Sequence, residues 1–223
     1  MPNTLQPAAQ NTPKEIYIGK TLAYRYELIS ELGKGGSSRV YKAYDKRKQE
    51  DLAIKHLVLS DKISEAERQM RIERFKQEAN TLSLLNHPNI ISVWEVLEIK
   101  GQYFMLMELL EGEALMSWVH HSQPSFYQIL IILSQLSNAL EDLHSKFIVH
   151  RDIKPENVMV LTDGTLKLLD FGIAKLQGYN HLTMDGTILG TVSYMSPEQL
   201  KNSRGSNHQS DIYSLGVLMY QLF

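Results

Sequence analysis

The sequence predicts an α+β fold in which a strand-rich first part precedes a mainly helical second part. Between residues 26 and 109, short β-prone runs alternate with glycine turns, and one charged helical segment interrupts them at 64–85. After Pro124, apolar residues recur at steps of three and four, which is typical of a long amphipathic helix. A very apolar segment at 212–223 predicts one more helix. We therefore expect the sheet to come first along the chain and the helices last.

Composition narrows the class of protein. The 223 residues are 43% hydrophobic and 22% charged, which suits a soluble protein with one large domain or two small lobes. With a formal charge of −2 and no long basic run, the chain gives no indication of nucleic acid or an anionic membrane as its principal partner. The absence of cysteine excludes disulfides and thiolate metal sites.

The first residues are expected to form a leader without fixed structure. Residues 1–14 are rich in Pro, Gln, Asn and Thr, and we assign 1–25 to a disordered leader. The start lacks the basic and apolar regions of a signal peptide, and the longest aliphatic run, 129–133, is too short to span a bilayer. We therefore expect a cytoplasmic location. Gly19-Lys20-Thr21 matches the end of a P-loop, but the required first glycine falls at Lys14, so we reject that interpretation.

A glycine-rich segment predicts a hairpin whose backbone could bind phosphate. Strand-like runs at 26–32 and 39–44 flank the sequence Gly33-Lys34-Gly35-Gly36-Ser37-Ser38. Without a Cβ, the backbone N–H groups of such a loop can approach phosphate oxygens closely. A glycine-rich turn is more often only a turn, so the loop alone does not establish a nucleotide site.

Two charged side chains follow the hairpin. Lys55 lies in the apolar strand 52–55, where period two places it on the same face as Ala53. Glu78 lies beside the apolar stripe of the helical segment 64–85. A solvated edge lysine and a surface carboxylate are the plain alternatives. The stripe consists of Phe75, Ala79, Leu82 and Leu85.

Further elements follow in order. Runs at 91–97 and 102–109 predict two strands joined at Lys100-Gly101. The apolar positions predicted for the long helix after Pro124 are Ile129, Ile132, Leu133, Leu136, Leu140 and Leu143. His144 and His150 lack the spacing of a metal site, and we expect His150 to be buried and hydrogen-bonded as loop scaffolding.

The polar stretch 150–157, His-Arg-Asp-Ile-Lys-Pro-Glu-Asn, lies between the apolar runs 146–149 and 158–161. A polar loop held between buried segments is usually a site. The segment after it predicts a hairpin with Asp163-Gly164 at its turn. If a two-residue turn closes there, the paired positions are Leu161 with Leu166, Val158 with Leu169, and Asn157 with Asp170. An amide oxygen and a carboxylate side by side would suit Mg²⁺.

These residues resemble a known family. His150-Arg151-Asp152 with Asn157, followed by Asp170-Phe171-Gly172, is similar to the catalytic and Mg²⁺-binding loops of eukaryotic-type (Hanks-type) protein kinases. Gly33, Gly35 and Val40 match the family's glycine loop, whereas its third glycine is Ser38 here. The segment 194–199, Tyr-Met-Ser-Pro-Glu-Gln, resembles the end of the activation segment in bacterial serine/threonine kinases. The resemblance covers about residues 26–223.

The resemblance implies a bilobal fold. It would have a small, β-rich N-lobe with one main helix at 26–108 and a mainly helical C-lobe at 109–223, incomplete after the helix that starts near Asp211. Kinase domains normally continue with more helices, so we expect the chain to be a fragment of a longer protein. The last helix would otherwise expose an apolar patch that promotes association, including dimerisation. Asp211 is expected to hold the backbone of the catalytic loop.

The implied function is transfer of the ATP γ-phosphoryl group to Ser or Thr hydroxyls of protein substrates. Asp152 would be the catalytic carboxylate, and Lys154 would neutralise the γ-phosphate. Asn157 and Asp170 would hold Mg²⁺. Lys55 would bind the α- and β-phosphates and pair with Glu78. The nucleotide-binding residues implied by the resemblance are Gly33, Lys34, Gly35, Gly36, Ser38, Val40, Ala53, Lys55, the gatekeeper Met107, the hinge residues Glu108 and Leu110, Met159 and Asp170.

Regulation is implied by the position of Arg151 before Asp152, because a phosphate on the activation loop could pair with it. The candidate threonines are Thr183, Thr187 and Thr191, although a flexible hydroxyl-rich loop explains any single one equally well. The alternative functions are a pseudokinase, meaning a nucleotide-binding scaffold or signalling module, and a phosphotransferase for small molecules.

Overall fold

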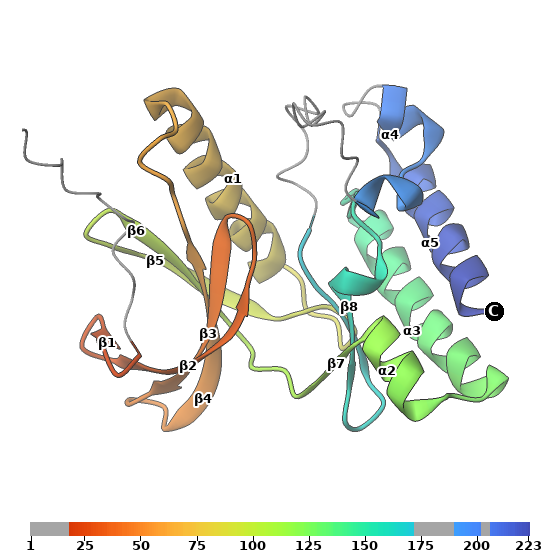
Figure 1. Cartoon of the computed structure of the whole chain (residues 1–223), viewed down its shortest axis with the longest axis horizontal. Helices are drawn as coiled ribbons and strands as arrows, with labels where there is room; N and C mark the ends of the chain where they lie inside the picture. The colour runs from red at the N-terminus through yellow and green to blue at the C-terminus, as the bar shows by residue number, and fades with distance from the viewer. Residues whose placement is uncertain (1–17, 172–189, 202–205) are drawn as a thin grey trace, which may run out of the picture. The chain divides into compact units, whose positions relative to one another are not determined.

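The computed structural model describes residues 18–171, 190–201 and 206–223 (Figure 1). The chain divides into two compact units. The first consists of Met1–Glu73 with Val96–Leu106, and the second of Arg74–Glu95 with Met107–Phe223. Among the described residues, no helix is both long enough and apolar enough to cross a membrane.

The first unit is built on a six-stranded sheet with the order β1-β2-β3-β4-β6-β5 (Figure 1). The strands are β1 (Thr21–Leu22), β2 (Tyr26–Lys34), β3 (Ser38–Asp45), β4 (Glu50–Leu57), β5 (Val93–Ile99) and β6 (Gln102–Met107). One face is covered by an apolar cluster that includes Tyr26, Tyr41 and Phe104. Since β4 lies between β3 and β6, its lysine, Lys55, is not on an edge strand.

Residues 18–25, which the sequence analysis assigned to the leader, extend this sheet. β1 pairs antiparallel with β2, and the N–H of Gly19 donates to the carbonyl of Leu28 at 2.8 Å. The turn between the two strands places Ala23 and Tyr24 at positive φ, 47° and 55°. The left-handed conformation at two successive residues suits the right-handed twist of a tight hairpin. The polar composition near the start of the chain therefore led the sequence analysis to miss the short strand β1.

The helix α1 (Glu65–Ser83) follows β4. Ser64 caps it, because its hydroxyl accepts the N–H of Glu67 at 3.2 Å. All four residues of the predicted apolar stripe are buried, which confirms the period that the sequence showed: Phe75, Ala79, Leu82 and Leu85 are between 1% and 8% exposed.

Among its described residues, the second unit contains the C-terminal part of α1, four further helices and a small sheet. The helices are α2 (Leu115–Ser122), α3 (Phe126–Ser145), α4 (Pro197–Lys201) and α5 (His208–Leu222), with 3-10 turns at Pro155–Asn157 and Gly190–Tyr194. The strands β7 (Gly112–Ala114), β8 (Val158–Leu161) and β9 (Leu166–Leu168) form the sheet β7-β8-β9. α3 buries every apolar position predicted for it and lies beside α5 (Figure 1).

The β8–β9 hairpin exists, but its predicted register is wrong by one residue. Val158 pairs with Leu168 and Val160 with Leu166, so Asn157 lies opposite Leu169 rather than Asp170. The turn contains three residues instead of two. Gly164 adopts φ 84° and donates its N–H to the carbonyl of Leu161 at 3.0 Å. A type I turn followed by a left-handed glycine adds one residue to the loop and shifts the pairing.

The starts of two other elements also differ from the positions expected from the sequence. The strand expected at 91–97 begins at Val93, because Ile91 instead donates its N–H to the carbonyl of Leu168 in β9. The last helix begins at His208 and not after Ser210. Asn207 caps it, and the hydroxyl of Ser210 accepts the N–H of Asn207 at 3.4 Å, so Ser210 completes a capping box from inside the helix.

Candidate functional site

The loop 150–157 is held by a buried carboxylate from α5. Asp211 is 1% exposed, and its two oxygens accept the N–H groups of His150 at 2.8 Å and Arg151 at 2.7 Å. Nε2 of His144, at the end of α3, lies 2.9 Å from the same carboxylate. Hydrogen bonds that involve an ionised acceptor are among the strongest in proteins. The expected role of Asp211 is therefore confirmed.

His150 is the scaffold that the sequence analysis expected. The side chain is fully buried, its Nε2 lies 2.8 Å from the carbonyl of Leu169, and its Nδ1 accepts the N–H of Asp152 at 3.3 Å. The ring also packs against Phe171, with centroids 4.6 Å apart. Burial lowers the pKa of His150, while the carboxylate of Asp211 opposes this shift. A neutral ring that donates through Nε2 and accepts through Nδ1 satisfies both contacts.

Two predicted side chains, those of Lys154 and Asn157, contact the carboxylate of Asp152. Nζ of Lys154 lies 3.2 Å from Oδ2 of Asp152, and the amide nitrogen of Asn157 donates to the same oxygen at 2.9 Å. The amide nitrogen also lies 2.8 Å from the carbonyl of Asp152 and 3.4 Å from the carbonyl of Asp170. The loop therefore gathers a carboxylate, a cation and an amide, and it places the amide beside the backbone of Asp170 despite the shifted hairpin.

The donors at this site fit a magnesium ion that has few protein ligands. Asn157 turns its amide nitrogen toward Asp152, which leaves the amide oxygen as the atom of that side chain suited to a cation. Asp170 is exposed and carries a carboxylate on a backbone with φ 29°. Within residues 18–171, 190–201 and 206–223, no three His, Cys, Asp or Glu side chains cluster as a metal cage. Mg²⁺ usually takes one or two carboxylates and fills the other positions with water and phosphate.

In the first unit, the glycine hairpin between β2 and β3 has room for a ligand at its tip. A Cβ on Gly33 or Gly36 would meet nothing within 4 Å, and neither residue has a positive φ. The chain itself therefore requires glycine at neither position. The N–H of Gly35 donates to the carbonyl of Ser38 at 2.8 Å, so Ser38 closes the turn. Glycines that the fold itself does not require leave the backbone N–H groups open to the close approach of phosphate oxygens.

Lys55 and Glu78 are both buried. Lys55 is 8% exposed and Ala53, on the same face of β4, is 4% exposed, while Glu78 of α1 is 7% exposed. Lysine and glutamate side chains are almost never fully buried unless they are paired. Lys55 belongs to the first unit and Glu78 to the second, and their ion pair stays a prediction.

The predicted hinge begins at the end of β6. The N–H of Glu108 donates to Ser92 at 3.0 Å, and its side chain accepts the N–H of Ser92 and the ammonium of Lys167, each at 2.7 Å. The carboxylate of Glu108 is therefore used to fix this segment. Met107 is 8% exposed, and Leu110 is half-buried. The contacts predicted between adenine and the backbone of Glu108 and Leu110 stay predictions.

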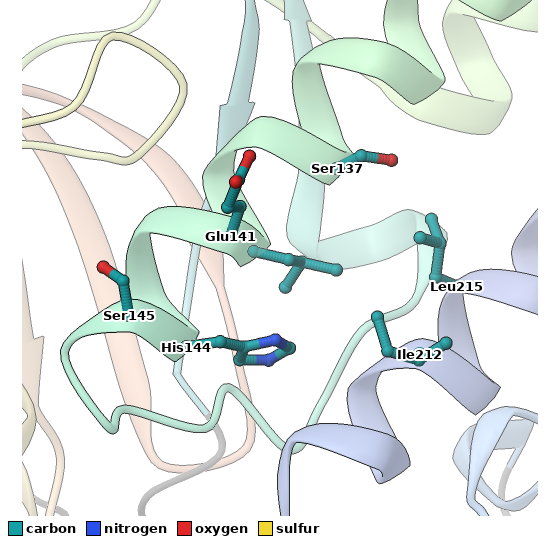
Figure 2. Close-up of a pocket in the computed structure, with 7 residues that line it drawn as sticks. Ser137, Glu141, His144, Ser145, Ile212 and Leu215 are labelled. Carbon is teal, nitrogen blue, oxygen red and sulfur yellow. The ribbon is translucent and has the colours of Figure 1, made fainter.

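A cavity of about 460 Å³ lies between α3 and α5 (Figure 2). Its lining residues are Ser137, Leu140, Glu141, His144, Ser145, Ile212 and Leu215. None of them was predicted as a site residue. The ring of His144 points from α3 toward Ile212 and Leu215 of α5 (Figure 2). Its Nε2 lies 2.9 Å from the carboxylate of Asp211.

Several contributors were missed by the sequence analysis. Gln199 of α4 is 7% exposed and donates from Nε2 to the carbonyl of Arg151 at 3.1 Å. Asn89 donates to Gln135 at 2.7 Å and to Leu166 at 2.9 Å, which ties residue 89 to α3 and β9. The Ser-x-x-Gln spacing at the start of α4 is the one local pattern that involves Gln199, and it indicates only a capping box. Nothing in the sequence predicted its distant partner.

Some predicted regulatory and metal-loop residues are not described. Thr183, Thr187 and Gly172 lie outside the described residues. Thr191 lies in the 3-10 turn Gly190–Tyr194.

Comparison with known proteins identifies the family. A model described as "Protein kinase domain" matches residues 26–223. The chain belongs to the protein kinase domain family. Relatives of this kinase domain include the probable serine/threonine-protein kinase PknB of Lactococcus lactis, at 37% identity over 93% of this chain and 32% of that protein. Others are PrkC of Bacillus subtilis, at 36% identity over 92% and 31%, and PknA of Mycobacterium tuberculosis, at 38% identity over 92% and 48%.

A solved structure shows the same fold. The apo form of PpkA-294 matches with a TM-score of 0.78 and 24% identity, over 93% of this chain and 78% of that chain. The bilobal α+β kinase fold expected from the sequence is thereby confirmed. The kinase domain spans about a third to a half of the length of the curated relatives named above.

Proposed function

We propose that this kinase domain transfers the γ-phosphoryl group of ATP to Ser or Thr hydroxyls of protein substrates. The observation that carries the proposal is the arrangement at Asp152, where Lys154 and Asn157 both contact one carboxylate oxygen, at 3.2 Å and 2.9 Å. A carboxylate with a cation beside it suits the positioning of a hydroxyl next to a phosphoryl group. The names of the bacterial relatives support the same reaction.

In the proposed reaction, Asp152 orients the acceptor hydroxyl. As the bond from that oxygen to Pγ forms, the bond from Pγ to the ADP oxygen breaks, and the hydroxyl proton passes late to Asp152. Lys154 neutralises charge on the transferred group. Asn157 and Asp170 would hold Mg²⁺, which when bound supplies positive charge to the phosphates. The hydrogen bond between Asn157 and Asp152 holds the two side chains in a fixed position relative to each other.

The nucleotide would be bound by the glycine hairpin and β4. The N–H groups near Gly33 and Gly36 would face phosphate oxygens, and Lys55, held by Glu78, would pair with the α- and β-phosphates. The open space where a Cβ would stand at Gly33 and Gly36 supports this role. In the second unit, the backbone at Glu108 and Leu110 would bind adenine.

Phosphorylation of the activation segment would regulate the enzyme through Arg151. Nε of Arg151 is buried and has no hydrogen-bond partner in the part of the chain that the structure describes. A guanidinium with an unused donor is suited to a phosphate on Thr183, Thr187 or Thr191. We also propose a cytoplasmic location for the domain and a capacity to dimerise.

The test is phosphotransfer from γ-labelled ATP to an acceptor protein. The wild-type domain should label Ser and Thr residues, and Asp152→Asn should lower kcat at least 100-fold with little change in affinity for Mg²⁺-ATP, because proton acceptance contributes about 10²–10⁴-fold. Lys146→Met, which removes only an exposed ion pair with Asp142, is the control. Full transfer by Asp152→Asn would refute the assigned role. Nucleotide binding without transfer would indicate a pseudokinase, and transfer only to small hydroxyl compounds would indicate a phosphotransferase for small molecules.

A further inference from the structure

Gln199 begins α4 together with Ser196 in a reciprocal capping box. Oε1 of Gln199 accepts the N–H of Ser196 at 3.0 Å, and the hydroxyl of Ser196 accepts the N–H of Gln199 at 3.4 Å. This pairing satisfies two backbone donors at the start of a helix. A capping box needs only the oxygen of the glutamine side chain. The amide nitrogen is left to make a contact that the helix does not require.

That contact reaches the loop 150–157. Nε2 of Gln199 donates to the carbonyl of Arg151 at 3.1 Å, across 48 residues of sequence. Ser196 is fully buried and Gln199 is 7% exposed, so the bond is largely shielded from water. Loss of a buried hydrogen bond leaves the remaining group unsatisfied, at a cost of about 1–3 kcal/mol. The fold therefore favours one fixed orientation of this carbonyl.

Arg151 is held in a conformation that a side chain rarely adopts. Its φ is 69°, in the left-handed region. Such residues persist where the surroundings impose the conformation, at a cost of about 1–3 kcal/mol. Asp211 accepts the N–H of Arg151 at 2.7 Å, and Gln199 donates to its carbonyl. The peptide groups on both sides of Arg151 are thus fixed, and the second of them leads directly into Asp152.

We propose that Gln199 is a positioning residue that holds the carbonyl of Arg151 and so sets the orientation of Asp152. Because the same side chain anchors the N–H of Ser196, it also links residues 190–196 to the loop 150–157. The amide group of Gln199 thereby couples Ser196 to the peptide group that precedes Asp152. This proposal rests on the proposed phosphotransfer function and adds a residue to it.

The test separates the two hydrogen bonds that Gln199 makes. Gln199→Glu keeps an oxygen for Ser196 but loses the donor to Arg151, whereas Gln199→Leu loses both. Gln128→Glu is the matched control, because Gln128 makes the same capping box with Ser125 at the start of α3. For phosphotransfer to protein, we expect kcat to fall about 10-fold or more in both Gln199 variants, as about 1.4 kcal/mol corresponds to tenfold. The KM for ATP should stay within about twofold of the wild-type value.

A merely structural role predicts a different pattern. If Gln199→Glu retains the wild-type kcat, the bond to Arg151 has no positioning role and the proposal is overturned, whatever Gln199→Leu does. Failure of the wild-type domain to phosphorylate protein would instead refute the proposed function. In that event, deuterium exchange of the amides at 150–152 decides the positioning role: faster exchange in Gln199→Glu than in Gln128→Glu supports it, and equal exchange overturns it.

Discussion

Two helices of the second unit begin with the same local motif, Ser-x-x-Gln. At α3, Ser125 and Gln128 form a capping box with distances of 2.8 Å and 3.4 Å, and both residues are exposed. At α4, Ser196 and Gln199 form the same box with distances of 3.0 Å and 3.4 Å, and both are buried. The first box only starts a helix. The second also donates a hydrogen bond to the carbonyl of Arg151.

The Ser-x-x-Gln motif specifies the start of a helix in both places. Only at α4, where the glutamine is buried, does the tertiary structure give its amide nitrogen a second partner. An exposed amide nitrogen exchanges its hydrogen bonds with water at little net cost. A buried one must find a protein partner, and at α4 that partner is the residue before Asp152. The opposite peptide group of Arg151 is fixed by Asp211. Variants at each of these contacts test whether the two capping boxes differ in what they hold in place.

The largest effect is expected for Asp211→Asn, which disturbs the hydrogen bond that holds the N–H of Arg151. The new amide group would turn a donor toward an N–H of His150 or Arg151, which are now bonded at 2.8 Å and 2.7 Å. A lost bond to a buried charge costs about 1.5–3 kcal/mol, so kcat should fall about 10- to 150-fold. Steady-state kinetics of phosphotransfer measures this. Asp142→Asn, on an exposed ion pair of α3, is the control, and a kcat within threefold of wild type in Asp211→Asn would contradict the account.

An intermediate effect is expected from removing the capping serines. Ser125→Ala should lower the free energy of unfolding by about 1 kcal/mol and leave kcat unchanged, because only the cap is lost. Ser196→Ala should lower both quantities, since the box that orients Gln199 is disturbed. Urea denaturation and steady-state kinetics on the same samples give the two values. Equal kcat in the two variants would mean that the buried box is no more than a helix start.

The smallest effect concerns Glu198, the residue before Gln199. The hydroxyls of Ser196 and Ser210 hydrogen-bond to its carboxylate and lower its pKa below the ordinary value. Because the folded pKa lies below the unfolded one, the charged form adds stability above about pH 4.3, and that stability is lost as the pH falls through the folded pKa. The melting temperature of the wild type should therefore exceed that of Glu198→Gln at pH 7, and the difference should shrink below about pH 4. Tyr127→Gln, at the equivalent position of α3, should show no such pH dependence.

Much of this site was accessible from sequence because it depends on local patterns. Asp152, Lys154 and Asn157 lie within six residues of one another, and the structure brings them into contact. The register of the β8–β9 hairpin was missed, because a left-handed Gly164 adds a residue to the turn and the sequence allows both turn lengths. The role of Gln199 was missed because its partner lies 48 residues away. Periodicity and spacing do not predict such long-range contacts.

The fold was predictable for a related reason. Helices with a clear apolar stripe, such as α3, and strands on either side of a glycine turn were found near their observed positions. The short strands β1 and β7 were not, since two or three residues carry no detectable period. Their places are set by neighbouring strands. The same division, between what a segment specifies alone and what its surroundings add, separates the two capping boxes.

A crystal structure of Gln199→Glu would test this account most directly, because it reports the backbone of Arg151 itself. We expect the capping box with Ser196 to remain, while φ of Arg151 leaves the left-handed region and the carboxylate of Asp152 moves away from Lys154. An unchanged φ near the present 69°, with Lys154 still 3.2 Å from Asp152, would contradict the claim that Gln199 fixes the loop.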